Sequence, residues 1–145
     1  MPITVINRQR ALSVDLPSLR EFAAQALVEC LKLQQRNLGA LADLPEVSVV
    51  LLSDKRIGEL HRRFMNDPTP TDVITFDHGE IFISTETAKR QARQFRTSLE
   101  HELRLYLVHG LLHLCGFDDK TRQGAAEMSR VQVKLVDRAL RRPVP

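Results

Sequence analysis

The sequence has few cysteines and no long apolar run, and both absences exclude classes of protein. Two cysteines in 145 residues, Cys30 and Cys115, cannot make the disulfide framework of a small secreted domain. Each lies in an apolar pattern of helical spacing, so we expect reduced core thiols. No segment resembles a membrane span, and the N-terminus MPITVINRQR has no signal-peptide core. We therefore expect a cytoplasmic protein without a membrane partner.

Internal repeats, low-complexity tracts and long linkers are also missing, so the chain is predicted to form a single domain over residues 1–145. The hydrophobic patterns predict four strands, at 3–8, 46–52, 71–76 and 79–84, and five helices, at about 17–36, 55–65, 85–95, 98–115 and 121–140. A tight hairpin is expected to join the third and fourth strands. This order predicts an α+β fold, in which a small mixed four-stranded sheet is covered by about five helices.

Turn and cap residues mark several of these boundaries. Asn37 to Gly39 is expected to end the first helix, and Ser53 to cap the second. The two prolines of 66–70 exclude regular structure there. Gly116 is expected to end the fourth helix in the left-handed conformation.

The charge is only mildly positive, and its type is more informative than its size. The net charge is +3, the sequence pI is about 9.2, and sixteen arginines accompany five lysines. Guanidinium groups suit phosphate because they bind it in a bidentate manner. Arginines cluster at 62–63, 90–96 and 141–142. These clusters permit a phosphate-bearing partner, although solvated helix faces explain them equally well.

The stretch HGLLHLCGFDD, residues 109–119, holds the candidate site. His109 and His113 are four residues apart and share one face of a helix that is apolar nearly all round. Buried imidazoles need partners, which are either a metal ion or backbone groups. After Gly116 the chain can turn back and bring Asp118 or Asp119 to the histidines. Two histidines and an aspartate would give zinc three ligands and one open position.

Two alternatives remain open for the residues that surround this pair of histidines. Asp118 and Asp119 can also be read as an N-cap of the last helix. Cys115, two residues past His113, could lie near a metal.

Three motifs stand in order along the chain: PTDVITF (70–76), GEIFIS (79–84) and HGLLHLCGFDDK, which begins at His109. They resemble PTDVLSF, GDIxIS and the signature HGxLHLxGYDH of the YbeY family, bacterial endoribonucleases of ribosomal RNA maturation. The resemblance covers roughly residues 45–135. It implies a zinc-dependent hydrolase with one Zn²⁺ per chain, cleaving single-stranded RNA in the maturation of the small-subunit ribosomal RNA 3′ end. It also implies that the partners are ribosomal RNA and the small subunit, and no DNA is expected.

The resemblance assigns the zinc ligands residue by residue. His109 and His113 match the first two ligands, and Asp119 stands where the signature has a third histidine. A carboxylate makes the site less positive than a third histidine would. Zinc held there should lower the pKa of its bound water less than zinc held by three histidines does. Met65 stands where many members have an arginine, and Arg62 or Arg63 is expected to contact RNA in its place.

The general base of a metalloprotease helix is absent, because glycine follows the first histidine at position 110. Peptide hydrolysis is therefore disfavoured. For RNA, the base could be a carboxylate such as Glu80, or zinc-bound hydroxide or the 2′-hydroxyl could act without one. Two other hypotheses are an RNA-binding ribosome assembly factor that does not cut, and a purely structural zinc site.

Overall fold

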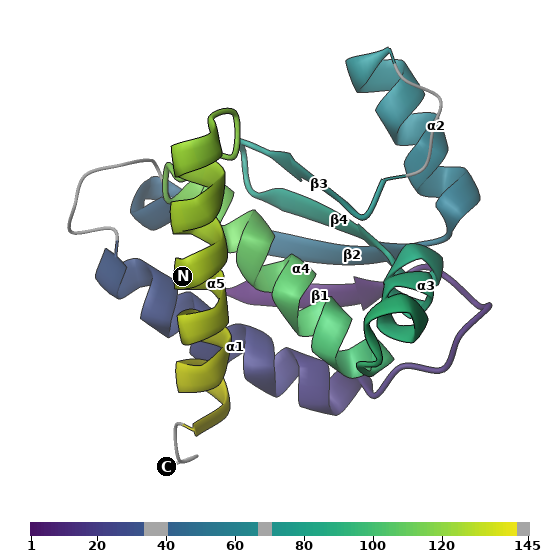
Figure 1. Ribbon diagram of the computed structural model, residues 1–145, viewed down its shortest axis with the longest axis horizontal. Helices are drawn as coiled ribbons and strands as arrows, with labels where there is room; N and C mark the ends of the chain where they lie inside the picture. The colour runs from purple at the N-terminus through teal and green to yellow at the C-terminus, as the bar shows by residue number, and fades with distance from the viewer. Residues whose placement is uncertain (34–40, 67–70, 142–145) are drawn as a thin grey trace.

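The computed structural model describes residues 1–33, 41–66 and 71–141 (Figure 1). The strands are β1 (Ile3–Asn7), β2 (Val47–Leu52), β3 (Val73–Phe76) and β4 (Glu80–Ser84), and the helices are α1 (Leu16–Leu33), α2 (Asp54–Met65), α3 (Thr85–Phe95), α4 (Leu99–Leu114) and α5 (Arg122–Arg141). All nine predicted elements are therefore confirmed in order. A short 3-10 helix, Leu41–Asp43, was not predicted. The predicted helix end at 37–39, most of the proline segment and Arg142 lie outside the described residues.

The four strands form one mixed sheet in the order β1-β2-β4-β3. β1 and β2 are parallel, β2 and β4 are parallel, and β3 runs antiparallel to β4. Gly79 adopts a φ of 110° in the hairpin turn, and its N–H donates to the Phe76 carbonyl at 2.9 Å. The α+β fold with a small mixed sheet is thus confirmed, and β3 is an edge strand.

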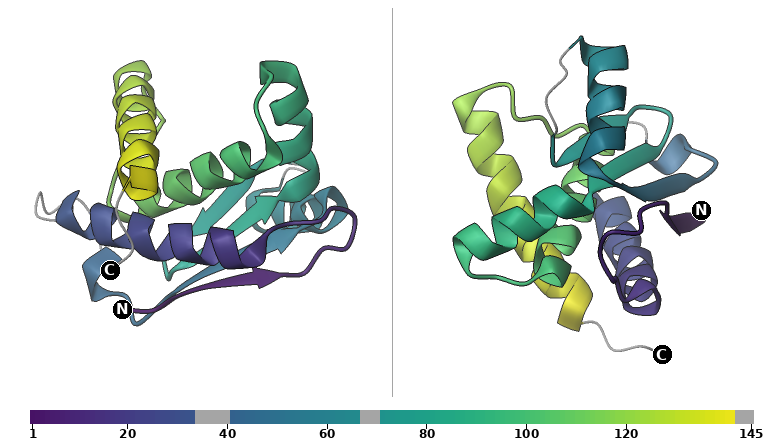
Figure 2. Two further views of the ribbon diagram at one scale, coloured as in Figure 1. Left: turned by 90° about the horizontal axis from the view of Figure 1, so that it is seen from below. Right: turned by 90° about the vertical axis from the view of Figure 1, so that its right-hand side faces the viewer.

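Helices cover the two faces of the sheet unequally. One face packs on α1 and α4, and α5 packs on these two helices (Figure 2). This side holds the main hydrophobic core, with Val49, Leu51, Ile81 and Ile83 fully buried. The other face carries a much smaller core, made by Val50, Leu52, Ile57 and Ile74. α2 supplies Ile57 to it, and α2 projects away from the rest of the molecule in Figure 1.

Serine side chains fix where three helices begin. Ser53, Ser84 and Ser98 cap α2, α3 and α4, and each hydroxyl accepts from a backbone N–H three residues on. The predicted cap at Ser53 is therefore confirmed. In the described part of the chain, no helix is long and apolar enough to cross a membrane.

Candidate metal site

The two histidines of the site lie on the last two turns of α4. The helix is buried around them, with Leu107, Val108 and Leu111 fully inside the core. His109 and His113 themselves are half-buried, and their rings meet edge to face with centroids 4.9 Å apart. Their four-residue spacing thus places both imidazoles side by side, as the sequence predicted.

A tight helix end returns the chain to these histidines. Gly116 has a φ of 101°, its N–H donates to the His113 carbonyl at 3.0 Å, and the Phe117 N–H donates to the Leu112 carbonyl at 3.0 Å. This pair of bonds is a Schellman motif, which needs a left-handed residue after the helix. Phe117 is buried, so the turn is anchored in the core. The predicted left-handed Gly116 is confirmed.

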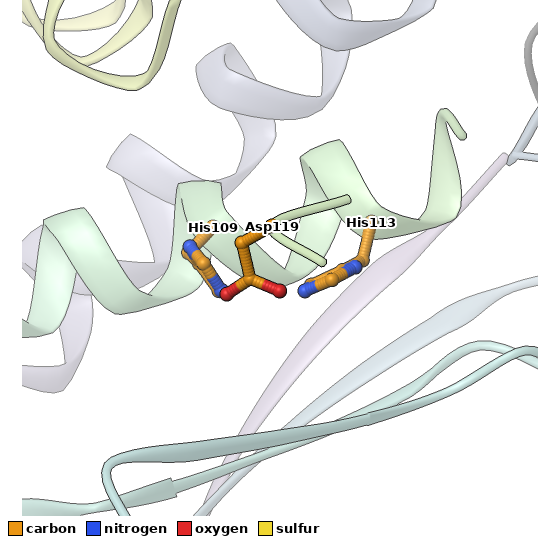
Figure 3. A group of neighbouring side chains, drawn as sticks. All are labelled: His109, His113 and Asp119. Carbon is orange, nitrogen blue, oxygen red and sulfur yellow. The ribbon is translucent and has the colours of Figure 1, made fainter. Parts of the chain in front are cut away.

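Asp119 lies between the two imidazoles after this turn (Figure 3). One ligand atom from each of His109, His113 and Asp119 lies within 4.8 Å of the other two. Both imidazoles are half-buried and the carboxylate is exposed, so the cluster opens to solvent on one side. These three residues could hold one metal ion.

The N-cap of α5 is a different residue. The Thr121 hydroxyl accepts from the Gly124 N–H at 2.9 Å, which is the geometry of an N-cap. Asp118 accepts from the Lys120 N–H at 3.1 Å within the preceding turn. Asp119 is therefore not needed as the cap, which removes the main alternative to its role as a ligand.

Gln132 of α5 fixes the orientation of one imidazole. His109 Nδ1 lies 3.0 Å from Gln132 Oε1, and an amide oxygen can only accept, so Nδ1 carries the hydrogen. The Nε2 lone pair of His109 is then free to face a metal.

The other imidazole is held in its neutral form. Burial lowers the pKa of His113 below its ordinary value, and the neighbouring His109 lowers it further. The nearby Asp119 and Asp118 carboxylates and a backbone hydrogen bond with Phe117 oppose this shift. A neutral imidazole at neutral pH is the form that binds a metal.

A pocket of about 220 Å³ lies between these histidines and the edge strand. Its far wall consists of Met65, Val73, Ile74, Thr75 and Asp77. The Thr75 Oγ1 is buried and makes no hydrogen bond within the described part of the chain. Thr75 and Asp77 were missed by the sequence analysis. Their alternation with Val73 was a signal that the three share one face of the strand.

The structure does not bring Glu80 to the histidines. Ile81, the next residue of β4, faces the main core, so Glu80 lies on the opposite face of the sheet. Its carboxylate pairs there with the ring of His78. Both Arg62 and Arg63 are exposed on α2, and Arg63 lines a second cavity on that same opposite face.

The two cysteines are free and buried, as predicted. The Cys115 thiol donates to the Cys30 carbonyl at 3.6 Å, so its sulfur points into the core. Cys115 is absent from the His–His–Asp cluster.

The α+β fold therefore carries an open pocket beside three residues that could hold one metal ion. The family model "Endoribonuclease YbeY" matches residues 4–139, and the chain belongs to the YbeY family. An endoribonuclease YbeY of Bacteroides fragilis is 42% identical over 82 residues, which cover 52% of this chain and 59% of that protein. The chain thus spans about three fifths of the length of that relative.

Two further comparisons extend over more of the chain. An endoribonuclease YbeY of Petrotoga mobilis is 31% identical over 140 residues, covering 91% of each chain. The solution structure of a Thermotoga maritima protein superposes with a TM-score of 0.65 at 29% identity, covering 94% of this chain and 88% of that one. The fold and the family are therefore established together.

Proposed function

We propose that the protein is a zinc-dependent endoribonuclease that cleaves single-stranded RNA. The observation that carries this proposal is the convergence of His109, His113 and Asp119 at an open pocket in a chain of the YbeY family. Two imidazoles and a carboxylate suit zinc better than magnesium or calcium. Three protein ligands leave a fourth position for water or substrate.

The donor set fits a resident metal by its chemistry. Gln132 orients His109, and the low pKa of His113 keeps that ring neutral, so both nitrogens can bind without first losing a proton. Asp119 adds a negative charge that partly neutralises a divalent ion. When bound there, zinc supplies Lewis-acid polarisation of a phosphate oxygen and a lowered pKa for its bound water.

The pocket wall opposite the histidines supplies the remaining groups. We assign Asp77 as the residue that accepts the proton of the attacking oxygen, because Asp77 is the acidic residue that lines the pocket with the histidines and Glu80 does not line it. Thr75 lines the same space, next to Asp77 along the edge strand. Asp77→Asn should lower kcat about 10²–10⁴-fold while zinc content stays unchanged.

The resemblance of the three sequence motifs supports a biological assignment. We propose that the substrate is ribosomal RNA near the 3′ end of the small-subunit RNA, that the partner is the small ribosomal subunit, and that the protein acts in the cytoplasm. Arg62 and Arg63 are proposed RNA contacts.

A non-catalytic RNA-binding assembly factor is the second candidate. Met65 favours it, because this uncharged side chain lines the pocket where the resemblance places an arginine. Purified protein should be incubated with single-stranded and duplex RNA, with and without a chelator, and after zinc is restored. Chelator-sensitive cleavage of the single strand alone supports the enzyme. RNA binding without cleavage, in zinc-loaded protein, supports the assembly factor.

A further inference from the structure

The sheet face opposite the histidines carries a connected row of aromatic side chains. The Phe64 and Phe76 rings meet edge to face with centroids 5.2 Å apart, and Phe76 and Phe82 do so at 5.8 Å. The His78 ring stacks on Phe76 at 5.7 Å. We call Phe64, Phe76, His78 and Phe82 the aromatic platform. It joins the C-terminal end of α2 to both strands of the β3–β4 hairpin.

The platform is more exposed than a core requires. Phe64 follows Ile57 by seven residues, so both lie on the same face of α2, yet Ile57 is fully buried and Phe64 is 57% exposed. His78 is also exposed, while Phe76 and Phe82 are half-buried. The small core beneath therefore holds Phe76 and Phe82 in place, and Phe64 and His78 are the exposed members of the platform.

A positively charged cavity adjoins the platform. It measures about 300 Å³, and the residues that line it are Arg8, Val50, Leu52, Arg56, Glu59, Leu60, Arg63 and Phe82. Three guanidinium groups thus face one carboxylate. None of the three arginines pairs with a carboxylate in the parts of the chain that the structure describes. Arg63 also lies over the Phe64 ring, 5.7 Å from its centroid, so charge and aromatic surface are continuous.

The platform and the metal site meet across the free edge of β3. Thr75 and Asp77 line the pocket of the histidines, and Phe76 between them belongs to the platform. The same relation holds at the end of α2, where Met65 lines the pocket and Phe64 belongs to the platform. One extended strand could therefore contact both surfaces by crossing a single β-strand.

We propose that the aromatic platform and its arginine cavity bind single-stranded RNA on one side of the scissile phosphate. Unpaired bases stack on Phe64 and His78, and Arg8, Arg56 and Arg63 contact the phosphates. Proteins that bind single-stranded nucleic acid combine aromatic rings, on which bases stack, with positively charged groups that contact the phosphates. The platform and its arginine cavity offer both. A duplex does not present its base faces, so the platform selects unpaired RNA. This inference rests on the proposed function and names the part of the substrate that lies outside the metal pocket.

The test is binding of a labelled single-stranded oligoribonucleotide in the presence of a chelator, so that cleavage plays no part. Phe64→Ala and His78→Ala should each weaken binding by about five- to a hundredfold, the range for loss of one stacked base. Phe64→Trp should keep the affinity, because it keeps an aromatic face. Log K falls as log salt rises, and Arg56→Ala should make this negative slope shallower by about 0.7.

Matched controls lie on other elements. Phe95 on α3 is 61% exposed, and Phe95→Ala should bind RNA as wild type does. Arg138→Ala on α5 should leave the salt slope unchanged. Melting temperatures should confirm that all variants are folded.

Two outcomes would overturn the proposal that the platform binds RNA. One is wild-type RNA affinity in both Phe64→Ala and His78→Ala. The other is a loss of RNA affinity in Phe95→Ala as large as in these two variants. The first would leave a protein partner or a second copy as the occupant of this face. Because binding is measured without metal, its result is independent of cleavage. A loss of affinity in a protein that never cuts RNA supports the platform and refutes the proposed enzyme. If the wild-type protein cleaves RNA but the platform variants bind RNA as tightly as wild type, the proposed enzyme is supported and the platform is refuted.

Discussion

Gly110 of α4 lies directly against Ile81 of β4. A Cβ built on Gly110 would lie 2.6 Å from Ile81 Cγ2 and 2.8 Å from its Cδ1, closer than side-chain atoms can approach. The position after the first histidine therefore faces the sheet and not the metal pocket. This is why the chain has no glutamate there, since a longer side chain has no space and could not reach a substrate.

The first prediction follows from this close approach. In an unhindered helix interior, Gly→Ala would stabilise the protein by about 1 kcal/mol. Here Gly110→Ala should destabilise it by about 1–3 kcal/mol through overpacking. The melting temperature should fall by about 2–4 °C for each kcal/mol.

A double-mutant cycle identifies the cause of that loss. Ile81→Ala removes the three nearest atoms, so Gly110→Ala should cost less in that background than in wild type. An equal cost in both backgrounds would show that the clash lies elsewhere.

The second prediction separates the metal ligand from the helix cap. Asp119→Ala should lose zinc, because only two protein ligands remain, and Asp119→His should retain it. Thr121→Ala should lose about 0.5–2 kcal/mol of stability and keep its zinc, because Thr121 caps α5. Asp118→Ala should also keep its zinc, since the Asp118 side chain accepts from the Lys120 N–H within the turn and is not part of the His–His–Asp cluster. Zinc stoichiometry and melting temperature should be measured for all four variants. Full zinc content in Asp119→Ala would refute the ligand assignment.

The fold could be predicted from the sequence because each element has a clear local pattern. Alternating β-branched residues indicated β1, and Gly116 marked the end of α4 through its own backbone freedom. The hairpin was equally local, since Gly79 permits the turn that joins β3 to β4. These features depend on neighbouring residues alone, and the structure confirms them.

The walls of the site were not predictable in this way. Gln132 lies four residues from both Met128 and Val136, which are buried, so the pattern marks a polar residue on an apolar stripe. Its partner His109 is 23 residues away and is brought to it only by the packing of α5 on α4. In the same way, alternation puts Thr75 and Asp77 on one face of β3. Only the strand order shows that this face meets the histidines.

The third prediction concerns acid stability and rests on Asp54. Burial raises the pKa of its carboxyl group, but hydrogen bonds from Arg90, Ser84 and Thr87 outweigh burial and lower the pKa below its ordinary value. The donor atoms of Arg90, Ser84 and Thr87 lie 2.6, 2.6 and 2.7 Å from its oxygens, so Asp54 links α2 to α3.

The sign of the pH dependence follows from this lowered pKa. The unfolded chain takes up a proton first as pH falls, so the stabilisation is complete above the ordinary pKa of about 3.9 and is lost as pH falls through the folded value. Asp54→Asn should therefore melt below wild type at neutral pH, and the gap should narrow in acid. Asp137→Asn, in an exposed pair with Arg141, should change the melting temperature little. A gap for Asp54→Asn that stays constant down to about pH 2 would contradict this account.

The last prediction concerns the hydrogen bond that orients the metal site. The Gln132 carbonyl accepts from His109 Nδ1 and so directs Nε2 towards Asp119. Gln132→Leu removes the acceptor at similar volume, and zinc affinity should fall about 10–100-fold, the usual effect of losing such a partner. Gln132→Glu should keep the affinity, because a carboxylate also accepts from Nδ1. Val133→Ala, at the next position and 60% exposed, is the matched control. Competition titration with a zinc chelator measures the affinities, and ¹⁵N shifts of His109 report which ring nitrogen carries the hydrogen. If Gln132→Leu binds zinc as tightly as Val133→Ala does, His109 is oriented by the packing of α4 and not by this bond.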